Sequence, residues 1–117
     1  MDAYVRRYGV PRVVFASGDL LALGAIRLFR EKGIGVPSQV GVIGATGLKM
    51  GAYTHPSLTV LDTPMERMGR EAGRMLLEMS RQNVSRLIGR YVPAPVVVRE
   101  SFPIPPELIE EESRGLS

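Results

Sequence analysis

Three short apolar runs constrain the fold of this 117-residue chain more than any other feature of its sequence. They cover residues 12–16, 40–44 and 58–61 and consist mainly of valine, isoleucine and leucine. The first run turns at Ser17-Gly18 into an apolar helical stretch, and the second ends in a glycine-rich turn. Short buried strands joined by helical or loop crossovers are typical of a parallel sheet covered by helices. We therefore predict an α/β fold with a mostly parallel sheet flanked by helices in three layers, α/β/α.

Start and stop signals predict three helices beside these strands. Residues 2–8 precede Gly9 and Pro11, and a second helix runs from the Ser17-Gly18-Asp19 turn to about residue 32, before Gly33. Thr63-Pro64-Met65-Glu66 predicts the start of a third helix, with Thr63 as N-cap and Glu66 completing a capping box. Its apolar residues recur every three or four positions over residues 65–79, which indicates an amphipathic helix.

The rest of the chain is predicted from its charges and prolines. On the third helix, Glu66–Arg70 and Arg74–Glu78 are spaced to form ion pairs one turn apart. We expect a turn over residues 82–85 and two strand pieces, at 87–92 and 96–99, separated by Pro93 and Pro95. An acidic tail over residues 107–117 is expected to fray.

Composition excludes several classes of protein. The chain has no cysteine, which excludes disulfides and thiolate metal sites, and it has no apolar run long enough to span a bilayer. We therefore expect a cytoplasmic protein with one domain at most. The net charge is +3, but the arginines are dispersed with few aromatic residues between them, which favours solvated helix faces over a nucleic-acid surface.

The order of three motifs resembles the effector-binding core of LacI/GalR-type transcriptional regulators. Residues 16–25 read ASGDLLALGA, residues 40–47 read VGVIGATG, and residues 56–61 read PSLTVL. In that family A-x-N-D-x-x-A-x-G-A, V-x-V-x-G-F-D-D and P-x-L-T-T-V follow one another at these spacings, and the resemblance spans about residues 10–101. It implies a periplasmic-binding-protein-like (type I) half. Residues 1–106 would form the C-terminal portion of an effector-binding and dimerisation domain, with residues 62–95 crossing into the other lobe.

The resemblance also implies a function. A small-molecule effector would control DNA binding by a helix-turn-helix domain that this chain does not contain, and the protein would act as a homodimer without membrane contact. Two alternatives stay open: a sugar- or solute-binding protein of a transport system, and a truncated relic that serves only as a dimerisation module. A helix-turn-helix encoded upstream would favour the regulator.

Carried over residue by residue, the family pattern points to an effector site with missing polar groups. Thr46 stands where the family places an aspartate that binds sugar hydroxyls, Gly47 replaces a second aspartate, and Gly18 replaces an asparagine, whereas Asp19 is retained. We therefore expect an effector that is not a simple sugar. The candidate contacts are Gly18, Asp19, Thr46, Met65 and Met68. Asp19 could instead only stabilise the start of its helix, and the methionines could instead be core residues.

The family pattern also places a dimer surface on the second helix and the loop before residue 55. Leu20 and Leu23 lie on a different stripe from Leu21, Ala25 and Leu28, and only one stripe can face the sheet. The candidate contacts are Leu20, Leu23, Ala52, Tyr53 and Thr54.

Other chemistry is not indicated. The glycines at 41, 44 and 47 fit neither the dinucleotide fingerprint nor the P-loop, and His55 is the chain's one histidine. No motif combines a nucleophile, a base and an oxyanion donor. We expect no enzyme activity, no cofactor and no metal.

Overall fold

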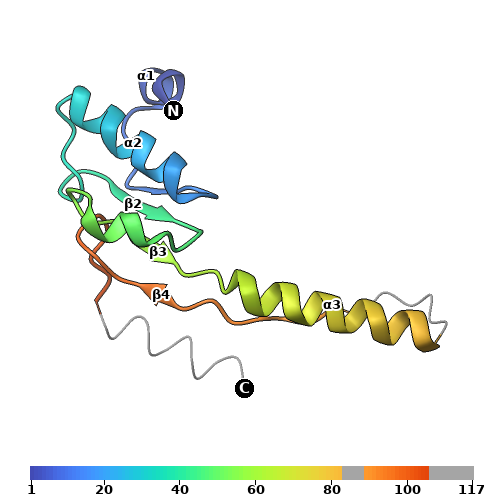
Figure 1. The fold of residues 1–117 in the computed structure, drawn as a ribbon. Coiled ribbons are helices and arrows are strands. Elements are labelled where there is room, and N and C mark those ends of the chain that lie inside the picture. Colours follow the sequence, from blue (N-terminus) through green and yellow to red (C-terminus); the bar gives the residue numbers. More distant parts are fainter. Residues whose placement is uncertain (83–88, 106–117) are drawn as a thin grey trace.

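A four-stranded sheet lies at the centre of the computed structural model, which describes residues 1–82 and 89–105 (Figure 1). Its strand order is β1-β2-β3-β4, with β1 at Val13–Phe15, β2 at Gly41–Gly44, β3 at Thr59–Leu61 and β4 at Val96–Val97. β1, β2 and β3 are parallel, whereas β4 runs antiparallel to β3. The predicted α/β fold with a mostly parallel sheet is confirmed.

Helix α2, Asp19–Glu31, packs on one face of this sheet and forms the core with it. The buried stripe of α2 differs from the one expected, because Leu21 is exposed and Leu28 is half-buried. Residues spaced by three or four positions along α2 instead meet the valines of β2 and β3 and the neighbouring Leu58. The buried apolar residues are Ala22, Ala25, Ile26, Phe29, Val40, Val42, Leu58 and Val60.

The other face of the sheet is covered less completely. The ring of Phe102 lies against Gly41, where a Cβ atom would come within 2.2 Å of it. On β1, the edge strand, Val13 and Phe15 remain exposed on this face, while Val14 points to the core. Helix α1, Asp2–Tyr8, lies beyond that edge (Figure 1) and ends at Gly9, which has a φ of +82°.

Helix α3, Met65–Gln82, extends away from the sheet, and residues 89–95 run back beside it (Figure 1). Arg90 joins the two segments, 3.0 Å from a carboxylate oxygen of Glu71 and 3.5 Å from one of Glu78. The predicted pair Glu66–Arg70 forms. The predicted partner of Arg74 is wrong: Arg74 lies 3.8 Å from Glu71, since Glu78 pairs with Arg90.

Three further expectations differ from the structure. The loop predicted before residue 55 contains a 3₁₀ helix, η1, at Lys49–Tyr53. No strand forms over residues 89–92, so the described part of the predicted strand at 87–92 is extended chain instead, and only Val96–Val97 of the second piece is a strand. The predicted turn begins inside α3 at Gln82. Residues 83–88 and the expected frayed tail at 107–117 lie outside the described residues.

Candidate functional site

The carboxyl ends of β1, β2 and β3 meet at one edge of the sheet, which is where open α/β sheets bind ligands. The chain leaves these strands at Ser17-Gly18, at Ala45-Thr46 and at Asp62-Thr63. The Thr63 hydroxyl donates a 2.8 Å hydrogen bond to the carbonyl of Ala45, which ties the exit from β3 to the loop after β2. The predicted capping role of Thr63 is wrong, because α3 begins at Met65 and, in the described residues, no backbone N–H of its first turn donates to the Thr63 hydroxyl oxygen.

Asp19 holds the loop after β2 against the start of α2. One carboxylate oxygen, Oδ1, accepts a 3.0 Å hydrogen bond from the backbone N–H of Thr46, and Oδ2 accepts one of 2.6 Å from the N–H of Leu48. The backbone N–H of Asp19 donates in return to the Thr46 hydroxyl at 2.9 Å. The side chain is fully buried, which leaves no oxygen exposed to an effector. In this structure Asp19 positions Thr46 and the rest of the loop.

Glycine at position 44 is required by the same arrangement. A Cβ atom on Gly44 would lie 2.3 Å from Oδ1 of Asp19 and 3.1 Å from a methyl group of Leu58. The carboxylate therefore fits over the end of β2 only because that strand ends in glycine. The Gly-x-Thr sequence after β2 and the buried aspartate of α2 form one structural unit.

Asp62 is a candidate site residue that the sequence reasoning missed. It follows β3 directly, and a Cβ atom on Gly47 would lie 2.1 Å from its Oδ1, so the two residues are packed together. Gly47 also has a φ of +80°, a conformation that favours glycine. Within residues 1–82 and 89–105, the exposed carboxylate of Asp62 has no side-chain hydrogen bond or ion pair. An acidic residue placed at the end of a buried strand was the signal that could have found it.

The other expected effector contacts flank this edge. Gly18 is the N-cap residue of α2, and a Cβ atom there would lie 3.9 Å from the Thr46 hydroxyl. Met65 and Met68 occupy the first turn of α3, and both are exposed rather than part of the core. Met65 lines an open hollow with Pro64, Glu66, Arg67 and Arg70. The structure therefore brings Gly18, Asp19 and Thr46 into contact and places the methionines at the start of the neighbouring helix.

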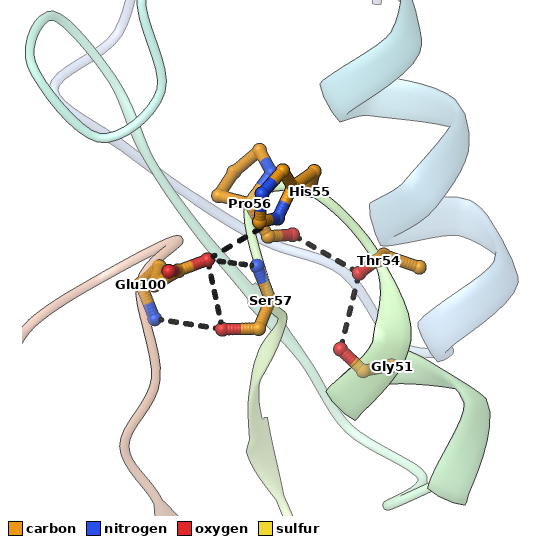
Figure 2. A network of polar contacts seen from close by, with 6 residues as sticks. All are labelled: Gly51, Thr54, His55, Pro56, Ser57 and Glu100. Atoms are coloured by element: carbon orange, nitrogen blue, oxygen red, sulfur yellow. Dashed lines mark hydrogen bonds and ion pairs between the residues drawn. The ribbon is translucent and has the colours of Figure 1, made fainter.

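The expected dimer contacts divide into exposed and half-buried residues. Leu20 is 65% exposed on α2, and Tyr53 is 88% exposed at the end of η1. Ala52 is exposed as well. Leu23 is half-buried and packs against the core of its own chain. The hydroxyl of Thr54 lies 3.0 Å from the carbonyl oxygens of Gly51 and Pro56, so it serves the local turn (Figure 2).

A serine, a histidine and a carboxylate come together at the opposite end of β3 (Figure 2). Glu100 accepts hydrogen bonds from the backbone N–H of Ser57, at 2.7 Å, and from its hydroxyl, at 3.1 Å. His55 Nδ1 lies 3.8 Å from the same carboxylate oxygen. The Ser57 hydroxyl therefore donates to the carboxylate and not to the imidazole, which is not the geometry of an activated nucleophile. The cluster joins the segment before β3 to the segment after β4.

Acid should weaken this junction, because the two hydrogen bonds from Ser57, with a smaller contribution from His55, hold the pKa of Glu100 below its usual value of 4.5. A carboxyl group whose pKa is lower in the folded state than in the unfolded state stabilises the fold at pH values above its unfolded-state pKa. This stabilisation is lost as the pH falls through the folded-state pKa. We expect the Tm to fall below pH 4.5 and Glu100→Gln to flatten that fall.

The measurement is the Tm by circular dichroism across the acid range for both proteins. Asp2, whose pKa is lowered chiefly by Lys32 and then by Arg6, provides the matched variant Asp2→Asn. Asp2→Asn should remove the part of the fall in Tm that comes from Asp2 and leave the part that comes from Glu100. Identical acid slopes in Glu100→Gln and the parent chain would contradict the assignment of this junction to Glu100.

Two negative observations apply to the described part of the chain. Among its histidine, aspartate and glutamate residues, no three lie close enough together to hold a metal ion. No helix in residues 1–82 and 89–105 combines the length and the apolar character needed to cross a membrane.

Comparison with known proteins identifies what the chain is similar to. The model of the periplasmic binding protein-like domain family matches residues 2–102. The HTH-type transcriptional repressor PurR of Photorhabdus laumondii is 34% identical over 103 residues, which cover 88% of this chain and 27% of that protein. The chain thus spans about a quarter of the length of this curated relative.

Solved structures show the same likeness. A complex of the transcriptional regulator CelR with cellobiose has a TM-score of 0.72 and 31% identity, covering 84% of this chain and 30% of that one. The lac repressor dimer, bound to operator and the anti-inducer ONPF, has a TM-score of 0.74 over 87% of this chain and 35% of that one. Its identity of 22% supports a shared fold only.

Proposed function

This chain belongs to the periplasmic binding protein-like domain family and, within it, to the LacI-type transcriptional regulators, and from this we propose that it forms the C-terminal portion of an effector-sensing and dimerisation domain. In the intact regulator, a helix-turn-helix domain outside this chain would bind DNA. The observation that carries the proposal is the carboxyl edge of the sheet, where the loops after β1, β2 and β3 are tied together by Asp19, Thr46 and Thr63.

The proposed mechanism is a change in the relative position of two lobes. An effector bound at the carboxyl edge would also contact a second lobe, towards which α3 and residues 89–95 would extend. Because the two positions of the lobes bind the effector with different affinity, binding shifts the equilibrium between them. The dimer would transmit this shift to the DNA-binding domains. If the effector changes the affinity for DNA, DNA must change the affinity for the effector by the same factor. Gly18, Thr46, Met65 and Met68 are the proposed contacts, and Asp19 positions Thr46.

The effector is proposed to differ from a simple sugar. The similar regulator CelR is solved in complex with cellobiose. In this chain the Thr46 hydroxyl oxygen already accepts a hydrogen bond from the Asp19 N–H, and position 47 carries no side chain to bind a hydroxyl. A polyol would therefore find fewer hydrogen-bond acceptors on this loop than a carboxylate pair offers.

The alternative of a solute-binding protein for a transport system is less well supported. The curated relative is a repressor, and the two solved structures quoted above are of regulators. We accordingly propose that the regulator is a homodimer in the cytoplasm and that its partners are a small-molecule effector and DNA. Activity as an enzyme is not part of the proposal.

A thermal-shift screen of the intact regulator tests this function. We expect at least one metabolite to raise the Tm in a saturable manner and, at the same concentrations, to change the affinity for operator DNA. Common hexoses and pentoses are expected to give no shift, because the usual hydroxyl-binding side chains are replaced. Saturable stabilisation by a simple sugar would contradict the effector class. A ligand that raises the Tm without altering DNA affinity would contradict the regulatory role.

A further inference from the structure

β1 is the first strand in the order of the sheet, so one of its edges has no neighbouring strand in the described part of the chain. On the other edge, the carbonyl of Arg12 and the N–H of Ala16 each form a 2.8 Å hydrogen bond with β2. Successive residues of a strand direct their N–H and C=O groups to opposite edges. Val14 therefore also faces β2, whereas the backbone groups of Val13 and Phe15 point outward along the open edge.

An apolar hollow flanks this open edge on each face of the sheet. The hollow on the α2 face is lined by residues that include Val14, Ala16, Leu20, Leu21 and Ala25. The hollow on the opposite face is lined by residues that include Tyr4, Pro11, Val13 and Phe15. No charged residue lines either hollow. Phe15 is 59% exposed here, although parallel sheets are usually covered on both faces.

The shape of this surface indicates an extended peptide segment as its partner. A small molecule could fill one hollow, but it would leave the outward N–H and C=O groups of Val13 and Phe15 without protein partners. An added strand pairs with these groups and directs alternate side chains into the two hollows. Because both hollows are apolar, the side chains on both faces of that strand must be apolar as well. A short run of valine, isoleucine and leucine meets this requirement.

We propose that the open edge of β1 is a docking surface for an apolar segment of the intact regulator outside residues 1–117, which adds a strand parallel to β1. This inference rests on the proposed function, since it requires a longer regulator. The chain spans 27% of the PurR relative and 30% of the CelR chain, so an intact regulator of similar length would supply further segments. A segment on the same polypeptide has a high effective concentration, which favours it over a second copy in dilute solution.

Hydrogen exchange at single-residue resolution, measured in the 117-residue chain and in the intact regulator, tests the proposal. In the 117-residue chain the N–H groups of Val14 and Ala16 should exchange slowly and those of Val13 and Phe15 rapidly. This alternation is the internal control, because it shows that β1 is paired with β2 there. In the intact regulator we expect exchange at Val13 and Phe15 to be slower by at least roughly tenfold.

Two variants of Phe15 test the apolar character of the partner. Phe15→Glu should change the Tm of the 117-residue chain by no more than about 3 °C, because the side chain is exposed there. In the intact regulator the docked strand would bury this charge, and we expect the Tm to fall by at least about 5 °C. Phe15→Leu is the matched control: it keeps an apolar side chain and should cause a smaller fall in the intact regulator.

Three results would overturn the proposal. If Val13 and Phe15 exchange as rapidly in the intact regulator as in the 117-residue chain, the edge has no docked strand. If Phe15→Glu lowers the Tm equally in both proteins, Phe15 supports the fold of this chain itself. If exchange at both residues slows in the 117-residue chain only at high concentration, a second copy occupies the edge. A regulator that gives any of these results but couples effector binding to DNA affinity retains the proposed function.

Discussion

Replacing Asp19 by alanine is expected to lower the free energy of unfolding by about 2–4 kcal/mol. The substitution removes both acceptors of the part-buried Thr46 and Leu48 N–H groups. A hydrogen bond to a charged group contributes about 1.5–3 kcal/mol, and the loss of two such bonds at part-buried donors accounts for most of the effect. The loss of the charged group at the start of α2 adds a smaller contribution of about 0.3–1 kcal/mol.

Urea denaturation followed by circular dichroism measures this change. Asp62→Ala is the matched control: it removes an aspartate at the same edge of the sheet whose side chain is exposed and unbonded in the described structure, and it should change stability by no more than about 0.5 kcal/mol. Asp19→Asn should fall between the two, because an amide retains one acceptor oxygen and presents a donor where the second acceptor was needed. Equal stability of Asp19→Ala and Asp62→Ala would show that the loop is not held by Asp19 in solution.

A charge at Leu20 is expected to convert the proposed homodimer into monomers. Leu20 and Leu21 are adjacent on α2 and equally exposed, at 65%, but they lie on different faces of the helix. By helical periodicity Leu20 lies opposite the buried stripe and Leu21 lies beside it, although both border the hollow that Phe15 lines at the β1 edge. In a two-fold contact each substitution occurs twice, so Leu20→Glu would bury two unpaired charges and strongly favour dissociation.

Sedimentation velocity of the chain, together with Leu21→Glu as the matched control, distinguishes the two faces. We expect Leu20→Glu to sediment as a monomer at a concentration where the parent chain and Leu21→Glu are dimeric, with unchanged circular dichroism. Tyr53→Glu should also weaken the dimer, because Tyr53 is a proposed contact and 88% of it is exposed. Dissociation by Leu21→Glu instead would place the contact at the β1 edge. Leu23→Glu is a poorer test, since Leu23 packs against its own core and its substitution would also destabilise the fold.

Local patterns in the sequence were enough to place most of the sheet and its helices. Valine-rich runs gave three strands that agree with β1, β2 and β3 to within one residue at each end. Glycines and a proline bounded α1 and α2, and the amphipathic repeat located α3 although the helix continues to Gln82. These features depend on neighbours in the chain, where propensity and periodicity act directly. The order of the motifs was also sufficient to recognise the family.

Contacts between distant residues were decided only by the tertiary structure. The Thr63 hydroxyl bonds to Ala45 rather than capping α3, and Glu78 pairs with Arg90, 12 positions along the chain, rather than with Arg74. The buried stripe of α2 depends on where the helix meets β2, which its own periodicity leaves undetermined because several stripes are apolar.

The candidate site divides in the same way. The sequence by itself placed Asp19 and Thr46 at strand ends, but it could not distinguish an aspartate that binds an effector from one that holds a loop. That distinction depends on burial: the folded chain surrounds Asp19 with backbone donors and leaves Asp62 exposed beside Gly47. A carboxylate enclosed by N–H groups is structural, and one left open to solvent is available to a ligand, because only the fold determines which donors reach each oxygen.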